Sequence, residues 1–318
     1  MNKFKIGIDI GGTKIAYGLF NDKKEIVYRH RASTDPTTTI EKFVRDTVND
    51  IEFILKENQL TKEHLQGIGM GFPSYVDFEQ GLVVFTSNMI NLNHFYARDT
   101  FQEYFPNSQI LVDNDTNLAA IAEHRYGAGK NLKNFLYTAL STGIGSGFII
   151  NNDIFRGDYG GAGESGHMII NPEKGIQCGC ENNGCFMSFA SGSMIVKHIA
   201  NELRNGRQSI IAEMVGGDFE KITAEHLNLA FTQGDPLAEQ MLDQIGYYIG
   251  LYVYNMFMSL NFNTYIFGGG MVNFGEPLLE RIQKSFDHFN HQKDQIIHLK
   301  KAELGNDFGI IGAVELLD

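Results

Sequence analysis

Short apolar segments that run directly into glycine-rich turns constrain this chain more than any other feature of its sequence. Phe4–Ile10 precedes Gly11-Gly12-Thr13, Phe135–Leu140 precedes Ser141–Gly147, and Tyr265–Phe267 precedes Gly268-Gly269-Gly270. Segments of this length that are rich in Ile, Phe and Leu predict strands, so each turn lies at a strand end. Glycine supplies 35 of the 318 residues, well above the usual share of about 7 per cent, and these turns account for part of the excess.

The order strand, glycine turn, strand, then helix, strand, polar loop and helix occurs twice. The first copy predicts strands at 4–10, 14–20, 25–30, 67–72 and 109–112, with helices at 40–55 and 118–124. The second predicts strands at 135–140, 148–150 and 265–267, with helices at 192–204, 223–233 and 235–261. This pattern predicts an α/β fold of two lobes with a cleft between them, residues 1–118 plus 305–318 and residues 119–304. The last helix, 310–317, is expected to return to the first lobe.

The glycine turns have the composition of phosphate-binding loops. Without a Cβ atom, glycine lets a phosphate approach backbone N–H groups, and the hydroxyls of Thr13 and Thr142 add donors beside Gly143. Asp9 can hold Mg²⁺ through water. Neither the P-loop nor the dinucleotide spacing is present. One such turn alone is more typical of a plain hairpin, but three at corresponding strand ends favour phosphate binding.

All three cysteines lie within eight residues, and a histidine precedes them by eleven positions: His167, Cys178, Cys180 and Cys185. Three thiolates and one imidazole form a closed tetrahedral set, which is the composition of a structural zinc site. Gly179 and Gly184 would let the chain fold around the ion. The alternative is three buried free thiols, and the C-x-C spacing does not match the C-x-x-C redox motif.

Two polar segments could handle a hydroxyl substrate. Asp113-Asn114-Asp115 follows a predicted strand, where ligands of open α/β sheets gather. Asp115 could accept the proton of an attacking hydroxyl while Asn114 orients that hydroxyl, or Asp115 could simply be the N-cap of the next helix. Glu164, in Glu164-Ser165-Gly166-His167, could accept two sugar hydroxyls or be a solvated loop carboxylate.

Charge and hydropathy restrict the partners and the compartment. The formal charge of −12 argues against a general nucleic-acid-binding protein. The most apolar stretch, 245–262, contains glycine, Asn255 and Ser259 and is too short for a membrane span. Asp9 and Gly11 interrupt the first apolar run too early for a signal peptide. We therefore expect a cytoplasmic protein without a membrane or nucleic-acid partner.

Together these motifs resemble the ROK family (repressors, open reading frames and kinases) over nearly the whole chain. The most specific matches are Glu164-Ser165-Gly166-His167 and Cys178-Gly179-Cys180…Gly184-Cys185. The resemblance implies an ATP-dependent sugar kinase with an actin/hexokinase-like (ribonuclease H-like) fold, and a homodimer. It assigns the ATP phosphates and Mg²⁺ to Asp9, Gly11, Gly12, Thr13 and Thr142, the adenosine to Gly268 and Gly269, and the sugar to Asn88, Asn114, Asp115, Glu164 and His167. Asp115 becomes the general base for the 6-hydroxyl.

Three positions depart from the family pattern, and two other functions stay open. Met187 stands where the family usually has a Glu near the reducing end of the sugar, Asn88–Leu92 differs from the usual Asn-Leu-Pro-Gly-Trp, and Ser74 replaces a glycine. We therefore expect a hexose or N-acetylhexosamine substrate other than plain glucose, or loose selectivity. The alternatives are a sugar-responsive repressor, which the position of Asp9 near the start and the acidic charge disfavour, and a sugar-binding protein without catalysis.

Overall fold

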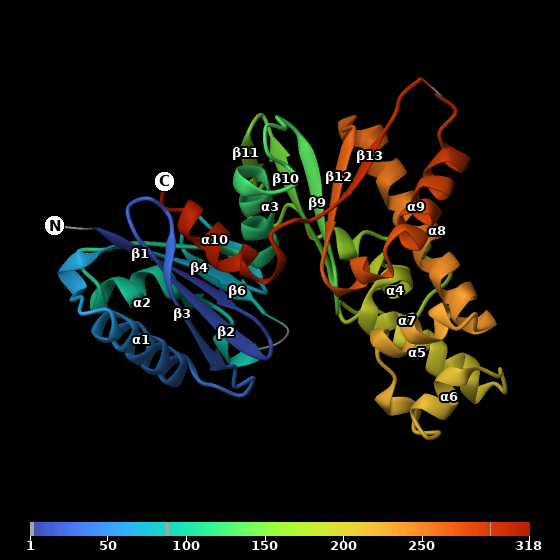
Figure 1. The fold of residues 1–318 in the computed structure, drawn as a ribbon, viewed down its shortest axis with the longest axis horizontal. Coiled ribbons are helices and arrows are strands. Elements are labelled where there is room, and N and C mark those ends of the chain that lie inside the picture. The colour runs from blue at the N-terminus through green and yellow to red at the C-terminus, as the bar shows by residue number, and fades with distance from the viewer. Residues whose placement is uncertain (1–2, 87–88, 293) are drawn as a thin grey trace. The chain divides into compact units, whose positions relative to one another are not determined.

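The chain forms two compact α/β units (Figure 1). The structure is a computed structural model that describes residues 3–86, 89–292 and 294–318. Unit 1 comprises Met1–Lys133, Gly147–Gly163 and Glu303–Asp318, and unit 2 comprises Asn134–Ser146 and Glu164–Ala302. The sequence predicts a boundary at residue 118, but that position lies inside helix α3 (Asp115–Tyr126), which belongs to unit 1 over its whole length.

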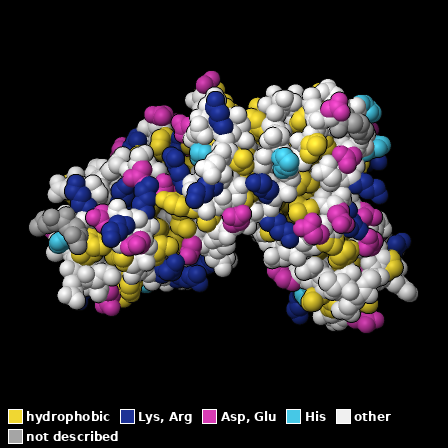
Figure 2. Space-filling model, turned by 45° about the horizontal axis from the view of Figure 1, so that its top comes forward, with side chains coloured by type: hydrophobic (Ala, Val, Ile, Leu, Met, Phe, Trp, Pro, Cys, Tyr) yellow, Lys and Arg dark blue, Asp and Glu magenta, His cyan; other side chains and the backbone are white. Residues whose placement is uncertain are grey.

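Acidic and basic side chains are interspersed on the surface. Figure 2 shows them mixed over the face in view, where no continuous basic area forms. Among the described residues, none of the helices is both long enough and apolar enough to cross a membrane.

A five-stranded sheet forms the centre of unit 1, in the order β3-β2-β1-β4-β8. Its strands are β1 (Phe4–Ile10), β2 (Lys14–Phe20), β3 (Ile26–Ser33), β4 (Leu65–Phe72) and β8 (Gln109–Asn114). Strands β1, β2 and β3 are antiparallel, whereas β1, β4 and β8 are parallel. All five strands are predicted by the sequence, with ends that differ by a few residues.

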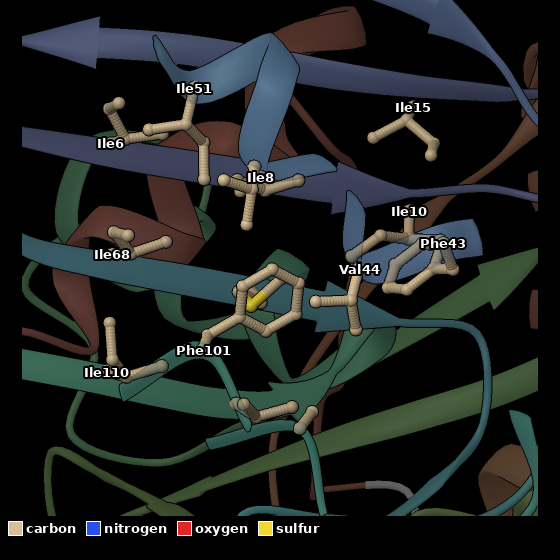
Figure 3. Packing of buried hydrophobic residues seen from close by; sticks show 14 of the residues in the cluster. Ile6, Ile8, Ile10, Ile15, Phe43, Val44, Ile51, Ile68, Phe101 and Ile110 are labelled. Atoms are coloured by element: carbon tan, nitrogen blue, oxygen red, sulfur yellow. The ribbon is translucent and has the colours of Figure 1, made fainter. Parts of the chain in front are cut away.

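Helices α1 (Ile40–Glu57) and α2 (Ala97–Tyr104) contribute to the main core of unit 1. As predicted, α1 begins at a hydroxyl cap, because Thr39 accepts a hydrogen bond from the Lys42 N–H at 3.3 Å. Figure 3 shows the apolar residues of α1 and α2 packed against the isoleucines of β1, β4 and β8. A small sheet of β5 (Tyr75–Asp77), β6 (Leu82–Phe85) and β7 (Phe95–Tyr96), which the sequence does not predict, completes this side.

Helix α10 (Phe308–Glu315) packs its backbone directly against β1 and β4. Successive side chains of a strand point to opposite faces, so Ile6, Ile8 and Ile10 enter the main core and Gly7 faces α10. A Cβ atom at Gly7 would overlap the carbonyl oxygen of Ile310, and one at Gly69 would overlap that of Ala313. Glycine at these positions therefore sets how closely the helix approaches the sheet.

The second five-stranded sheet has the order β11-β10-β9-β12-β13, and the chain passes from unit 2 to unit 1 within β10. The strands are β9 (Phe135–Leu140), β10 (Ile144–Ile150), β11 (Asp153–Phe155), β12 (Thr264–Gly268) and β13 (His298–Lys301). The predicted turn at 141–147 is too long, because β10 already begins at Ile144. Gly147 lies inside this strand, where a Cβ atom would press on Ala120 of α3.

The helices of unit 2 include all three that the sequence predicts in this region. They are α4 (Met187–Ala190), α5 (Gly192–Arg204), α6 (Ile210–Met214), α7 (Ala224–Thr232), α8 (Pro236–Leu260) and α9 (Glu276–Phe289). Asp235 caps α8 by accepting hydrogen bonds from the N–H groups of Leu237 and Ala238 at 2.9 and 3.0 Å. Most of the apolar residues in the stretch 245–262 are buried in this unit.

We predict that Gly69→Ala destabilises the protein much more than Gly67→Ala. At Gly69 the new methyl group would meet the backbone of α10, whereas at Gly67 it would first meet the end of the Leu317 side chain, which can turn away. Because overpacking against a backbone has no easy relief, we expect a loss of about 3 kcal/mol or more at Gly69 and about 1 kcal/mol at Gly67. Urea unfolding measures both, and equal losses would contradict this account of the packing.

Candidate active site

The first glycine turn joins β1 to β2 in unit 1. The Gly11 N–H donates to the Lys14 carbonyl at 2.9 Å, and Thr34 donates its hydroxyl to the Gly11 carbonyl at 2.6 Å. Gly11 therefore closes the hairpin with its own backbone groups, while Gly12 and Thr13 are exposed. Of the predicted phosphate-binding residues in this turn, Gly12 and Thr13 can present backbone or hydroxyl donors.

Asp9 lies at the end of β1, on the face that carries α10. A Cβ atom at Gly309, in the first turn of α10, would overlap the Asp9 carboxyl group. Burial raises the pKa of Asp9 to about 6, and the nearby Lys14 opposes this rise. Asp9 is half-buried and lies beside the glycine turn that the sequence predicts to bind phosphate. A carboxylate is the donor type that Mg²⁺ prefers, so the residues present fit the predicted magnesium site.

The junction between β8 and α3 carries the predicted base. Asn114 is the N-cap of α3, and its side-chain oxygen accepts hydrogen bonds from the N–H groups of Thr116 at 2.8 Å and Asn117 at 3.2 Å. Its amide also donates to the Ser74 carbonyl at 2.8 Å. Asp115 is the first helical residue, and its Oδ1 accepts from the Thr116 hydroxyl at 3.1 Å. The alternative that Asp115 is the helix cap is therefore wrong.

Two charged residues that the sequence does not single out support this junction. Asp113 is only 1% exposed and accepts hydrogen bonds from the Arg156 guanidinium group at 2.9 Å and from the Asn117 side chain at 2.9 Å. Burial raises the pKa of Asp113, and the positive charge of Arg156 opposes this effect. The sequence analysis includes Asp113 only as part of the Asp113-Asn114-Asp115 segment, and no motif near Arg156 indicates its role.

The second glycine turn, Ser141–Gly143, borders a cavity of about 320 Å³ that lies entirely within unit 2. The residues that line the cavity include Ser141 and Thr142, Gly192 and Ser193 at the start of α5, Thr223, Glu225 and Asn228 around α7, and Gly270, Met271, Asn273 and Phe274. The N–H of Gly192 donates to the Ser141 carbonyl at 2.8 Å, and that of Ser193 donates to the Thr142 carbonyl at 3.2 Å. The start of α5 therefore holds the turn in place.

Gly268 and Gly269, which the sequence predicts to lie by the adenosine, directly precede the lining residue Gly270 but do not line the cavity themselves. A Cβ atom at Gly268 would overlap the Tyr137 hydroxyl, and one at Gly269, whose φ is +87°, would overlap the Leu140 carbonyl oxygen. Both residues thus allow β12 to approach β9, and Gly270 is the first of the three glycines to face the cavity.

The Glu164-Ser165-Gly166-His167 motif forms a short 3-10 helix (Ser165–His167) with two buried and two exposed residues. The buried hydroxyl of Ser165 lies 2.6 Å from that of Ser146, which is also 2.8 Å from the Tyr252 hydroxyl and 3.1 Å from the Thr138 hydroxyl. A Cβ atom at Gly166 would overlap the carbonyl oxygen of Ile144. Ser165 and Gly166 anchor the motif, while Glu164 and His167 stay accessible.

The four predicted metal ligands come together. The ligand atoms of His167, Cys178, Cys180 and Cys185 all lie within 4.8 Å of one another, and Cys178 Sγ is 3.5 Å from His167 Nδ1. Cys180 Sγ is also 3.5 Å from Cys185 Sγ. Tetrahedral zinc with bonds of about 2.3 Å to sulfur places its ligands roughly 3.8 Å apart, so this donor set fits such an ion.

The three positions that depart from the family pattern have different surroundings. Met187 begins α4, and its Cε atom would lie 3.8 Å from a Cβ atom at Gly143. Ser74 is 8% exposed, and its hydroxyl finds no hydrogen-bond partner among the described residues. Asn88, the predicted sugar ligand of unit 1, lies outside the described residues.

Comparisons with known proteins identify the family and the fold of this chain. A model of the ROK family matches residues 5–318. A glucokinase of Halalkalibacterium halodurans is 30% identical over 98% of this chain and 94% of its own length. A xylose repressor of Caldicellulosiruptor bescii is 29% identical over 93% of this chain and 74% of its own. The structure of a ROK family glucokinase from Streptomyces griseus in complex with glucose and AMPPNP has a TM-score of 0.80 and 29% identity, with 98% of each chain covered. The predicted actin/hexokinase-like α/β class is confirmed by this match.

Proposed function

The chain belongs to the ROK family and is an ATP-dependent sugar kinase, and we propose that it transfers the γ-phosphate of ATP to the 6-hydroxyl of a hexose or an N-acetylhexosamine. The observation that carries this proposal is the division of roles between Asn114 and Asp115. Asn114 satisfies the first N–H groups of α3, so the carboxylate of Asp115 is not needed as a cap.

In the proposed reaction Asp115 acts as the general base. Its carboxylate accepts the proton of the 6-hydroxyl while the sugar oxygen bonds to the γ-phosphorus and the bond to the leaving ADP breaks. The position of Asp115 at the carboxyl end of a parallel strand supports this role, because ligands of α/β sheets gather at such ends. Phosphoryl transfer depends mainly on positioning and on stabilisation of charge.

We assign ATP to the two glycine turns and to the cavity of unit 2. Thr142 and Gly143 would hold phosphates, and the apolar and polar residues beyond them would surround the adenosine. Gly12 and Thr13 would supply further donors in unit 1. Asp9 would hold Mg²⁺, which neutralises phosphate charge when it is bound.

We assign the sugar to Asn88, Asn114, Asp115, Glu164 and His167. Nδ1 of His167 faces Cys178, so Nε2 is the ring nitrogen left for a hydroxyl group. Met187 would present apolar surface where most family members have a carboxylate, which favours a substrate with an apolar substituent or a loose preference near the reducing end.

We propose that the metal site holds structural zinc. Three thiolates and one imidazole leave no open position for a substrate, so the ion would fix the loop 178–185 and orient His167. Gly184, with a φ of +80°, supports this role, because a Cβ atom there would overlap the Asn171 carbonyl oxygen.

We also propose that the protein is a cytoplasmic homodimer without nucleic-acid or membrane partners. Thiolate ligands persist best in a reducing compartment. Most of the apolar residues of α8 are already buried in unit 2, which leaves only exposed positions such as Tyr247 and Met258 for a second copy. The net charge of −12 disfavours the repressor alternative.

We predict that Asp115→Asn lowers kcat by about 10²- to 10⁴-fold, the usual contribution of a positioned base, with little change in the KM for ATP. An ADP-release assay over glucose, N-acetylglucosamine, N-acetylmannosamine, mannose and fructose measures this and identifies the preferred sugar. Asp99→Asn is the control, because Asp99 lies in the first turn of α2 and is exposed. ADP release with none of these sugars would contradict the proposed function.

We predict that Met187→Glu shifts the sugar preference toward glucose. The new carboxylate would accept hydrogen bonds near the reducing end, and a hydroxyl that gains such a partner gains about 1–3 kcal/mol. The ratio of kcat/KM for glucose to that for the preferred sugar should therefore rise by roughly 5- to 100-fold. If the wild-type protein already prefers glucose exclusively and the variant keeps that preference, Met187 does not set selectivity.

We predict one zinc ion per chain. The three cysteines of the sequence are all in this site, so a thiol reagent reports on the site alone. Elemental analysis should find zinc, and the thiols should react slowly until a chelator is added. Cys185→Ser should lose the metal, whereas Asn182→Ala, whose amide lies 3.6 Å from Cys180 Sγ, should keep it. Full zinc content in Cys185→Ser would contradict the assignment.

A further inference from the structure

Arg156 is a half-buried residue that joins two segments of unit 1 and has no role in the proposed reaction. It follows β11, and its side chain is 21% exposed. The guanidinium carbon lies 3.7 Å from the centre of the Phe78 ring, so the charge is sandwiched between an aromatic face and a carboxylate. Both Nε at 2.9 Å and Nη2 at 2.8 Å contact Asp113 Oδ2.

Asp113 joins Arg156 to two residues near the proposed base, Asn114 and Asn117. Its second oxygen, Oδ1, accepts hydrogen bonds from the Asn114 backbone N–H at 2.8 Å and from the Asn117 side chain at 2.9 Å. Four donors therefore surround a carboxylate that is 1% exposed. Asn114 precedes Asp115 in the sequence and Asn117 follows it, so the Asp113 carboxylate contacts the start of α3 through one backbone N–H and one side chain.

The segment that follows Arg156 is also held closely. Cβ atoms at Gly160 and Gly161 would overlap the Val76 carbonyl oxygen and the Tyr75 ring, so residues 160–161 lie directly on β5. The Tyr75 hydroxyl donates to the Tyr159 carbonyl at 2.6 Å. Arg156 thus connects the β8–α3 junction to the loop that leads along the chain to Glu164.

We propose that Arg156 is a positioning residue for the phosphoryl transfer, acting through Asp113 to hold Asp115 in the orientation that accepts the hydroxyl proton. This inference rests on the proposed role of Asp115. Arg156 itself does not need to touch the sugar or ATP, because its guanidinium group is already occupied by Asp113 and Phe78. Loss of Arg156 would leave the buried Asp113 carboxylate without its cation, so this carboxylate would have to turn away or take up a proton. Either change would weaken its hydrogen bonds to the Asn114 N–H and to the Asn117 side chain, which lie on either side of Asp115 in the sequence.

The test compares Arg156→Ala and Arg156→Lys with the wild-type protein. We expect kcat to fall by about 100-fold in Arg156→Ala and by about 10-fold in Arg156→Lys, because small misplacements of a catalytic group cost this much. The KM for ATP should change less than twofold, since Asp113 and Phe78, which Arg156 contacts, are not among the residues assigned to ATP. Guanidinium chloride, far below denaturing concentrations, should restore part of the activity of Arg156→Ala. If Arg156→Ala does not fold, Arg156→Lys decides the question.

Arg98→Ala is the matched control. Arg98 is 29% exposed and lies in unit 1, and its guanidinium group contacts the Glu79 carbonyl rather than the β8–α3 junction. This variant should keep kcat and should not respond to guanidinium. The double variant Asp113→Asn with Arg156→Ala removes the unpaired charge and should recover thermal stability without recovering kcat.

Two outcomes would overturn the inference alone, and a third would overturn it together with the proposed role of Asp115. It is wrong if both Arg156 variants keep kcat within twofold of the wild type while Asp115→Asn loses activity. It is also wrong if the double variant regains full kcat, because charge rather than position would then explain the loss. If Asp115→Asn itself retains kcat, the base assignment fails, and the inference fails with it.

Discussion

The contact between the backbone of α10 and the glycines of β1 and β4 sets the surroundings of Asp9 at the end of β1. Because Gly7 and Gly69 have no side chains, the helix lies directly on the sheet. The same alternation that turns Gly7 toward α10 turns Asp9 toward it two residues later, where Gly309 leaves room for the carboxyl group. The N-terminal end of α10 and the end of β1 are therefore brought together by packing, and burial raises the pKa of Asp9.

The β8–α3 junction distributes its structural and chemical tasks over neighbouring residues. Asp113 points inward and is saturated by donors, and Asn114 caps the helix and holds the Ser74 carbonyl. Asp115 follows as the first helical residue. A carboxylate that also had to cap the helix would lose basicity, because backbone N–H groups stabilise its charged form. The three-residue order thus leaves the helix cap to Asn114 rather than to Asp115, the proposed base.

Local patterns in the sequence predict helices and strands, but they do not predict the contacts between residues that lie far apart in the sequence. Strands β1 and β2 and helices α5, α7 and α8 follow from apolar spacing and caps in their own segments. The predicted turn extends to Gly147, but this residue lies within β10, next to Ala120 of α3. Helix α9 is missed although Pro277 and Leu278 begin a helical spacing. Arg156 could not be predicted, since its partner Asp113 lies 43 positions away in the sequence.

The motif that most clearly identifies the family contains two residues whose contacts are structural. In Glu164-Ser165-Gly166-His167, the serine joins a buried hydroxyl cluster with Ser146 and Tyr252, and the glycine permits contact with β10. The Tyr252 ring in turn stacks on Phe186, whose ring centre is 4.7 Å away and which directly follows Cys185, one of the four proposed metal ligands. One buried tyrosine therefore contacts both the motif and the loop proposed to hold the metal. The accessible Glu164 and His167 are held at the surface by a network that no substrate needs to touch.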